Sequence, residues 1–249
     1  MKLTPEPARA LRSASRVAVL TGAGISAESG IPTFRDALTG LWTRYRPEDL
    51  ATPEAFQRNP GLVWNWYRMR RQRLRGVSPN PGHYALAELA RRVPDCTLMT
   101  QNVDGLHALA GSRDVIELHG NLTRVKCFAA GHPAGDFADS DAESDRLPLC
   151  DRCGSPLRPD VVWFGESLPV EALRRAQAAA LGCAVFLSIG TSNLVEPAAS
   201  LPWLAAARGA SVIVVNPSME GQRSGTGIHQ LAGPAGVVLP SLLRAAWPE

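Results

Sequence analysis

A glycine-rich turn near the start of the chain is the first group of residues whose spacing could do chemistry. The string Gly22-Ala-Gly24-Ile-Ser-Ala27 follows a short apolar run and opens a segment that could form a helix. Glycines at such a turn let the backbone bend sharply and approach a pyrophosphate, and N–H groups at the start of a helix can donate to its oxygens. The pattern favours a bound dinucleotide, although a tight strand-to-helix turn without a ligand would give the same spacing.

The residues after this turn disfavour one class of dinucleotide enzyme. A dehydrogenase of the hydride-transferring type needs a second strand soon after the helix, ending in an acidic residue that binds the adenosine ribose. Here the chain continues Ser29-Gly-Ile-Pro-Thr-Phe-Arg-Asp36, in which Pro32 blocks a simple helix-to-strand connection and no apolar strand follows. We therefore expect a loop carrying Phe34 and Arg35 to leave the sheet.

A tyrosine and an arginine form a second group that could bind a ligand. Tyr67 and Arg70 lie three residues apart in a predicted helix, so both side chains fall on one helical face. A phenol hydroxyl and a guanidinium together can bind a carboxylate through charge-assisted hydrogen bonds. Arg70 could instead be one more solvated arginine, because the same helix carries several others.

Two cysteines form a third group. Cys150 and Cys153 make a Cys-x-x-Cys knuckle followed by Gly154, which is half of a structural zinc site. A redox role is disfavoured, because the βαβ context of redox motifs of this type is missing.

Alternating strands and helices must position these groups. Apolar runs predict strands at Arg16–Thr21, Cys96–Thr100, Val115–Leu118, Val161–Trp163, Ala184–Ile189, Ser211–Val215 and near Val237–Leu239. Helices are predicted at Pro53–Arg75, Gly82–Arg92, Pro169–Leu181, Pro197–Arg208 and the C-terminus. Because Pro60 cannot donate a helix hydrogen bond, the first of these should be two helices. The alternation predicts an α/β fold with a parallel sheet covered on both faces.

Composition narrows the remaining classes. The chain has 249 residues, of which 45% are hydrophobic and 20% charged, with a net charge of only +3. That is enough apolar material for a core without disulfides, and the small charge argues against a dedicated nucleic-acid binder. No stretch approaches the roughly 18 apolar residues of a membrane span, and Met1–Leu20 shows no secretory signal. We therefore expect a cytoplasmic protein, and a monomer, without membrane or nucleic-acid partners.

Several strings together resemble the sirtuin family. The segment from Gly22 to Arg35 closely matches the family's first signature, and Thr100-Gln-Asn-Val-Asp-Gly-Leu-His107 matches its second. His119-Gly120 matches the catalytic position, and Val161-Val-Trp-Phe-Gly-Glu166 matches the substrate-binding strand. Gly190-Thr-Ser192 and Asn216 match later cofactor contacts. The matches occur in the family's order from about Val19 to Pro240, which is nearly the whole chain.

The resemblance implies both an architecture and an activity. It implies a Rossmann-like NAD-binding domain of residues 1–35, 81–120 and 161–249, and a small domain of residues 36–80 and 121–160. The small domain would combine a helical insertion with a zinc-ribbon-like module. The implied enzyme is an NAD-dependent protein lysine deacylase that releases nicotinamide, free lysine and O-acyl-ADP-ribose. Its partners would be proteins that carry acylated lysine.

The resemblance also assigns the cofactor-binding residues. His119 would be the general base that takes a proton from a ribose hydroxyl, a role that suits histidine because its ordinary pKa lies near neutrality. Taken alone, His119 would be a structural histidine at a strand end. Asn102 and Asp104 would hold the nicotinamide carboxamide or a water beside it, and are catalytic candidates with His119. The NAD-binding set implied is Gly22, Ala23, Gly24, Ser26, Ala27, Ile31, Thr33, Phe34, Arg35, Gln101, Asn102, Asp104, His119, Gly190, Thr191, Ser192, Asn216, Pro217 and Ala235.

Within the family, the chain resembles members that prefer succinyl, malonyl or glutaryl lysine. Those members carry a Tyr-x-x-Arg pair and a small residue in an Ala-Thr-Pro segment, which here are Tyr67, Arg70 and Ala51. Alanine leaves room for a longer acyl chain, whose terminal carboxylate the pair would bind. Acetyl-lysine should also be a substrate. The substrate-binding set implied is Ala51, Tyr67, Arg70, Val161, Val162, Phe164, Gly165 and Glu166.

The cysteine module departs from the family's pattern. The family carries a second Cys-x-x-Cys upstream, but here Ala130 stands where its second cysteine should be, so Cys127 is the only thiol. His132 could complete a Cys₃His set for a structural Zn²⁺. The ligands would then be Cys127, His132, Cys150 and Cys153. The alternatives are a weaker three-ligand site or no metal.

Two rival functions come from other classes. A mono-ADP-ribosyltransferase or NAD glycohydrolase would share the glycosidic chemistry but pass the ribose to a protein side chain or to water. His119 and the segment Val161–Glu166 favour capture by an acyl-lysine instead. A non-catalytic module that senses NAD or binds acyl-lysine is the second rival, and the intact His119 and Asn102 argue against it.

Overall fold

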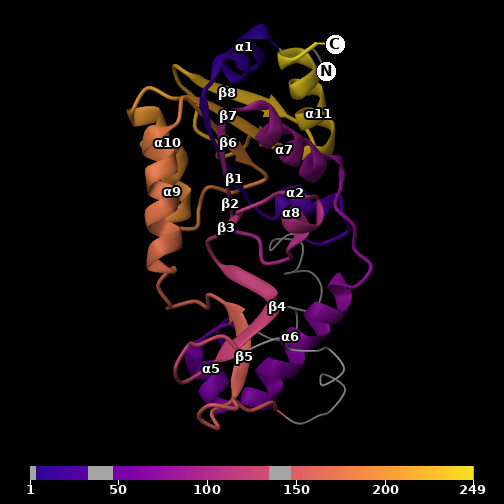
Figure 1. Cartoon of the computed structure of the whole chain (residues 1–249), viewed down its shortest axis with the longest axis vertical. Helices are drawn as coiled ribbons and strands as arrows, with labels where there is room; N and C mark the ends of the chain where they lie inside the picture. The colour runs from indigo at the N-terminus through magenta and orange to yellow at the C-terminus, as the bar shows by residue number, and fades with distance from the viewer. Residues whose placement is uncertain (1–3, 33–46, 135–146, 249) are drawn as a thin grey trace.

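The computed structural model describes residues 4–32, 47–134 and 147–248. Six parallel strands form its main sheet, in the order β3-β2-β1-β6-β7-β8 (Figure 1). The strands are β1 (Arg16–Thr21), β2 (Asp95–Thr100), β3 (Ile116–Glu117), β6 (Val185–Ile189), β7 (Ser211–Asn216) and β8 (Ile228–Ala232). The strand order reverses between the neighbours β1 and β6. In sheets of this type, ligands bind outside the carboxyl ends of the strands at such a point.

Helices cover both faces of this sheet (Figure 1). One face carries α1 (Pro5–Ser13), α7 (Pro81–Arg92) and α11 (Ala235–Ala246); the other carries α9 (Val170–Gly182), the short turn η3 (Ala198–Ser200) and α10 (Leu201–Ala207). Residues of β1 alternate between the two cores, with Val17 and Val19 on the first face and Ala18 and Leu20 on the second. Burial on both faces explains why the run reads as continuously apolar.

A smaller part of the molecule lies beyond the sheet's carboxyl edge, at the lower end of Figure 1. It contains a two-stranded antiparallel sheet and a group of helices. Its elements are α4 (Pro47–Leu50), α5 (Pro53–Arg58), α6 (Pro60–Leu74), β4 (Gly120–Cys127) and β5 (Leu157–Val161). Two one-turn helices, α2 (Gly24–Ala27) and α8 (Leu106–Leu109), follow β1 and β2.

The predicted α/β fold with a doubly covered parallel sheet is confirmed. The predicted helix break is also confirmed, because α5 ends at Arg58 and α6 begins at Pro60. Asn59 lies between them and caps α6 by accepting a hydrogen bond from the Leu62 N–H at 3.1 Å. None of the described helices is long and apolar enough to cross a bilayer.

Two strand predictions are wrong. Val237–Leu239 lies within helix α11. The last strand of the sheet is β8, which begins at Ile228, nine residues before Val237. Short apolar runs do not distinguish a buried helix from a strand, and Val238, Leu239 and Leu242 have the spacing of one helical face. The predicted strand Val161–Trp163 also differs, because β5 ends at Val161 and pairs with β4 instead of the main sheet. The division into two domains stays a prediction.

Candidate functional site

Three glycines pack against one another where β1 and β6 end. The Gly24 N–H donates to the Gly190 carbonyl at 2.9 Å. A Cβ atom at position 24 would lie 2.7 Å from Gly190 Cα, and one at position 22 would lie 2.8 Å from the Gly190 oxygen. Gly190 also has a positive φ of 62°, which other residues adopt at a cost. The glycine spacing therefore lets two turns meet at the point where the strand order reverses, in addition to any contact with a ligand.

Replacing Gly24 with alanine is expected to lower the free energy of unfolding by about 2 kcal/mol, because overpacking against backbone cannot be relieved by a side-chain rotation. Urea denaturation followed by circular dichroism would measure the loss. Gly61→Ala is the matched control, since Gly61 lies in α6 and a Cβ there would have Asn59 Oδ1 as its nearest neighbour at 3.9 Å. Alanine should be neutral or stabilising at that helical position. Equal stability of Gly24→Ala and the parent protein would contradict the packing explanation.

A hydrogen-bonded unit joins the turns that follow β1 and β2. The Ser26 hydroxyl, which is buried, donates to Asp104 Oδ2 at 2.7 Å and accepts from Asn102 Nδ2 at 3.1 Å. Asn102 Nδ2 also donates to the Gly22 carbonyl at 3.1 Å. Asp104 Oδ1 accepts from the Leu106 N–H at 2.9 Å. The side-chain nitrogen of Asn102 therefore donates both of its hydrogens within the protein. No described residue donates to Asn102 Oδ1, which can accept a hydrogen bond from a ligand amide.

His119 is oriented by a backbone carbonyl. Its Nδ1 lies 3.0 Å from the Gln101 oxygen, and because a carbonyl only accepts, Nδ1 carries the proton. Nε2 of the neutral ring is then an unprotonated acceptor without a partner among the described residues. Burial lowers the pKa of His119 below its ordinary value, and the bond to Gln101 opposes this only in part. The His119 carbonyl accepts from the Val162 N–H at 2.9 Å, which joins the base to the predicted substrate segment.

A buried polar layer lies beneath Asn102. Thr100 Oγ1 accepts from the Asn102 N–H at 3.0 Å and bonds to Thr21 Oγ1 at 2.8 Å. His107 Nε2 lies 2.8 Å from the same Thr21 hydroxyl. Burial lowers the pKa of His107 to about 3, with a further contribution from the neighbouring His83, so its ring is neutral. This layer supports the turn that carries Asn102 and was not predicted from the sequence.

The later cofactor candidates lie at the carboxyl ends of β6 and β7. The Thr191 carbonyl accepts from Asn216 Nδ2 at 2.8 Å and from Gln222 Nε2 at 3.2 Å. Thr191 Oγ1 also donates to Asn193 Oδ1 at 2.6 Å. Asn193 and Gln222 were not predicted. In the structure Asn193 has a positive φ of 53°, which asparagine tolerates better than most residues.

The remaining cofactor candidates differ in their exposure. Ile31, Ala23 and Ser192 are half-buried, and Ala235 is buried in the first turn of α11. Ala27 and Pro217 are exposed. Thr33, Phe34 and Arg35 lie outside the described residues. The binding roles of all these residues stay predictions.

The predicted acyl-binding residues come together in the smaller part of the molecule. Ala51, Tyr67 and Val161 belong to one buried apolar cluster with Trp163. The Phe164 N–H donates to the Ala51 carbonyl at 2.9 Å. The Arg70 guanidinium lies 5.5 Å from the centre of the Tyr67 ring. No carboxylate of the described residues pairs with Arg70, and burial lowers its pKa from the ordinary value.

Glu166 is engaged by the protein itself. Its two carboxylate oxygens accept from buried Arg158 at 2.5 and 2.9 Å, and Oε2 also accepts from the Trp163 N–H at 2.7 Å. Burial would raise the pKa of Glu166, but Arg158 outweighs that effect and holds the pKa below its ordinary value. Glu166 therefore fixes the segment that follows β5. A direct contact between Glu166 and substrate stays a prediction, as it does for its neighbours Val162, Phe164 and Gly165.

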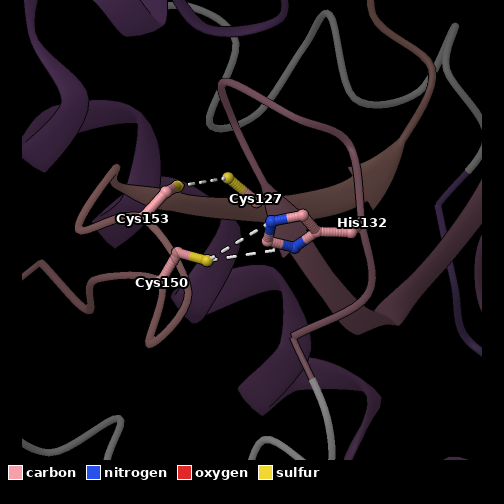
Figure 2. A group of neighbouring side chains, drawn as sticks. All are labelled: Cys127, His132, Cys150 and Cys153. Atoms are coloured by element: carbon pink, nitrogen blue, oxygen red, sulfur yellow. Dashed lines mark hydrogen bonds between the residues drawn. The ribbon is translucent and has the colours of Figure 1, made fainter.

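Three cysteines and a histidine converge where β4 meets the loop before β5 (Figure 2). Cys127 Sγ lies 3.5 Å from Cys153 Sγ, and Cys150 Sγ lies 3.8 Å from His132. Zinc–ligand bonds of about 2.0–2.3 Å in a tetrahedron place ligand atoms roughly 3.5–3.8 Å apart. A hydrogen bond from the Ala130 N–H, which outweighs the opposing effect of burial, helps lower the pKa of the Cys127 thiol to about 7. The donor set fits a structural zinc ion. His132 supplies the fourth ligand atom, which the side chain of Ala130 cannot provide.

Purified protein is expected to carry one zinc ion per chain, and its removal by a chelator should lower Tm by about 5 °C or more, because metal binding contributes to folding free energy. Elemental analysis and thermal scans would measure both. Cys150→Ser should lose the metal, whereas the control Cys183→Ser, at a cysteine outside this cluster, should retain it. Metal-free protein with an unchanged Tm would contradict the assignment.

Comparison with known proteins adds to this geometry. The model of the Sir2 family matches residues 22–197. A Pseudomonas aeruginosa protein named NAD-dependent protein deacylase 1 is 52% identical over 243 residues, which cover 96% of this chain and 97% of that protein. A Ralstonia nicotianae protein named NAD-dependent protein deacylase is 55% identical over 242 residues, covering 96% of each. Among solved structures, a Sir2 homologue in complex with NAD matches with a TM-score of 0.88 at 43% identity, covering 98% of this chain and 94% of that one.

Proposed function

Because the chain belongs to the Sir2 family, it is an NAD-dependent protein deacylase, and we propose that His119 is its general base. We also propose that the enzyme removes succinyl and malonyl as well as acetyl groups from lysine. The observation that carries the first proposal is the tautomer of His119. Its Nδ1–H is fixed by the Gln101 carbonyl, so Nε2 presents a lone pair at the carboxyl edge of the sheet.

His119, Asn102 and Asp104 have different roles in the proposed reaction. When bound, NAD supplies an electrophilic ribose carbon, once nicotinamide leaves, for the acyl-lysine oxygen to attack. His119 Nε2 takes the proton of a ribose hydroxyl, so that this hydroxyl can attack the acyl carbon. Asn102 Oδ1 accepts from the nicotinamide carboxamide, and Asp104 acts by holding Ser26 and, through it, the Asn102 side chain.

Product analysis tests this function. Acetylated peptide incubated with NAD and enzyme should give deacetylated peptide, nicotinamide and O-acetyl-ADP-ribose in equal amounts by mass spectrometry. ADP-ribose attached to protein would indicate a ribosyltransferase instead, and free ADP-ribose without deacetylated peptide would indicate a glycohydrolase. If the acetylated peptide remained unchanged in the presence of NAD and enzyme, the proposed deacylation would be contradicted.

The acyl range rests on a second set of observations. The Arg70 guanidinium contacts the Tyr67 ring, and no carboxylate of the described residues pairs with it. Ala51 contributes little volume to the apolar cluster that contains Tyr67. A dicarboxylic acyl group would supply the missing anion. A solved Sir2 structure holds a myristoylated histone peptide, at a TM-score of 0.75 and 34% identity, covering 97% of this chain and 95% of that one. That relative supports acylated protein substrates for this chain.

We also propose the partners of the enzyme, its location and the roles of its two domains. The partners are proteins with acylated lysine, and the enzyme acts as a cytoplasmic monomer. The Rossmann-like domain carries the NAD-binding residues and the substrate-binding segment Val161–Glu166, and the small domain carries Ala51, Tyr67, Arg70 and the zinc ligands.

A further inference from the structure

The Tyr67 hydroxyl makes one hydrogen bond to a described residue, and its direction is fixed. Trp163 Nε1 lies 2.9 Å from the Tyr67 oxygen, and an indole nitrogen can only donate. Tyr67 is therefore the acceptor, and its own proton is not used in this bond. No described residue accepts that proton, although Tyr67 is only 3% exposed. Because an unpaired buried donor is costly, the proton is suited to an acceptor on a ligand.

The hydroxyl also remains a neutral donor. Burial raises the pKa of Tyr67, so it keeps its proton at physiological pH. The Arg70 guanidinium lies on the same face of α6, 5.5 Å from the ring centre. A phenol proton and a guanidinium on the same helical face form a donor set for a carboxylate.

Trp163 is held firmly on more than one side. The Arg158 guanidinium lies 3.3 Å from the centre of its ring, and Phe56 lies 5.4 Å away. Arg158 is itself 4% exposed and is anchored to Glu166, which also accepts from the Trp163 backbone N–H. The indole N–H is therefore a fixed donor that leaves the Tyr67 proton directed away from Trp163. Donation to the hydroxyl oxygen also strengthens the hydroxyl as a donor.

We propose that Trp163 is a positioning residue for acyl selectivity, which orients the Tyr67 hydroxyl toward the carboxylate of a succinyl or malonyl group. The inference rests on the dicarboxylic acyl range proposed above. It adds Trp163 to the residues that determine this selectivity, and Trp163 belongs to the segment after β5 and not to helix α6. Arg158 and Glu166 support Trp163 in this role.

A double-mutant cycle tests the proposal. Trp163→Phe keeps an aromatic ring but removes the N–H, and should lower kcat/KM for a succinyl-lysine peptide about tenfold while changing acetyl-lysine less than about twofold. In a Tyr67→Phe background, Trp163→Phe should cause no further loss of selectivity, because the group it orients is gone. Trp64→Phe is the control, since Trp64 is equally buried in α6 but belongs to a separate cluster with Cys127. It should leave the succinyl-to-acetyl ratio unchanged.

Two outcomes would overturn the role of Trp163. Equal losses on both acyl groups would show a purely structural effect, and a tenfold loss of selectivity that persists in the Tyr67→Phe background would show that Trp163 does not act through Tyr67. The Arg70→Met variant separates this failure from that of the acyl range. If Arg70→Met is selective and Trp163→Phe is not, only the positioning role fails; if neither is selective, the dicarboxylic range fails with it.

Discussion

Replacing His119 with alanine is expected to lower kcat/KM for acetyl-lysine peptides about a thousandfold, because general base catalysis typically contributes a factor of 10²–10⁴. The loss should be equally large for succinyl-lysine, since the base acts on the ribose hydroxyl and not on the acyl group. NAD binding, followed by calorimetry, should change far less than turnover. Formation of nicotinamide and deacylated peptide under steady-state conditions would measure the effect.

A second histidine provides the control. His229 lies in β8, is half-buried, and is distant in the sheet from β2 and β3. His229→Ala should retain turnover close to that of the parent protein. A His119→Ala enzyme that kept full turnover would remove the base assignment while leaving the family membership intact.

The pH profile gives an independent check on the same residue. A base must be unprotonated to act, and burial lowers the pKa of His119. The acid limb of kcat/KM should therefore have its midpoint below the ordinary histidine value of about 6.5, so activity persists as pH falls through 6.5 and is lost only at lower pH. The His119→Ala enzyme should lack this limb. A midpoint above 6.5 would contradict a base in this buried setting.

Replacing Arg70 with methionine is expected to lower kcat/KM for succinyl-lysine peptides about a hundredfold and to change acetyl-lysine only slightly. Loss of one partner of a buried charged pair costs about 2–5 kcal/mol, and only the succinyl group carries the partner charge. Methionine retains much of the side-chain volume, so packing against Trp66 and Tyr67 is largely kept. Parallel assays on acetyl, succinyl and malonyl peptides would measure the ratio.

Arg73→Met is the matched control for this experiment. Arg73 lies one turn further along α6 and is exposed, so the same substitution should leave the ratio unchanged. If Arg70→Met weakened both acyl groups equally, Arg70 would be a structural residue and the dicarboxylic preference would be lost.

The sequence by itself determined the architecture of the larger part and most of the candidate residues. Continuous apolar runs such as Arg16–Thr21 identified parallel strands, because burial on both sheet faces removes polar residues from the pattern. Pro60 located the break between α5 and α6, since proline cannot donate inside a helix. Local chemistry also singled out Cys150 and Cys153, whereas His119 was identified as a catalytic residue only through the family resemblance.

Only the tertiary structure decided which groups are paired and which are free. Glu166 is bound by Arg158, whereas the Tyr67 proton and His119 Nε2 have no partner among the described residues. Likewise, the sequence left three alternatives for the cysteine module, and only the structure shows His132 against Cys150. The pairing of Val161 with Gly120 was not predicted at all. The physical reason is that hydrogen bonds and packing join side chains distant in the chain, while sequence patterns report only periodicity and local backbone preference.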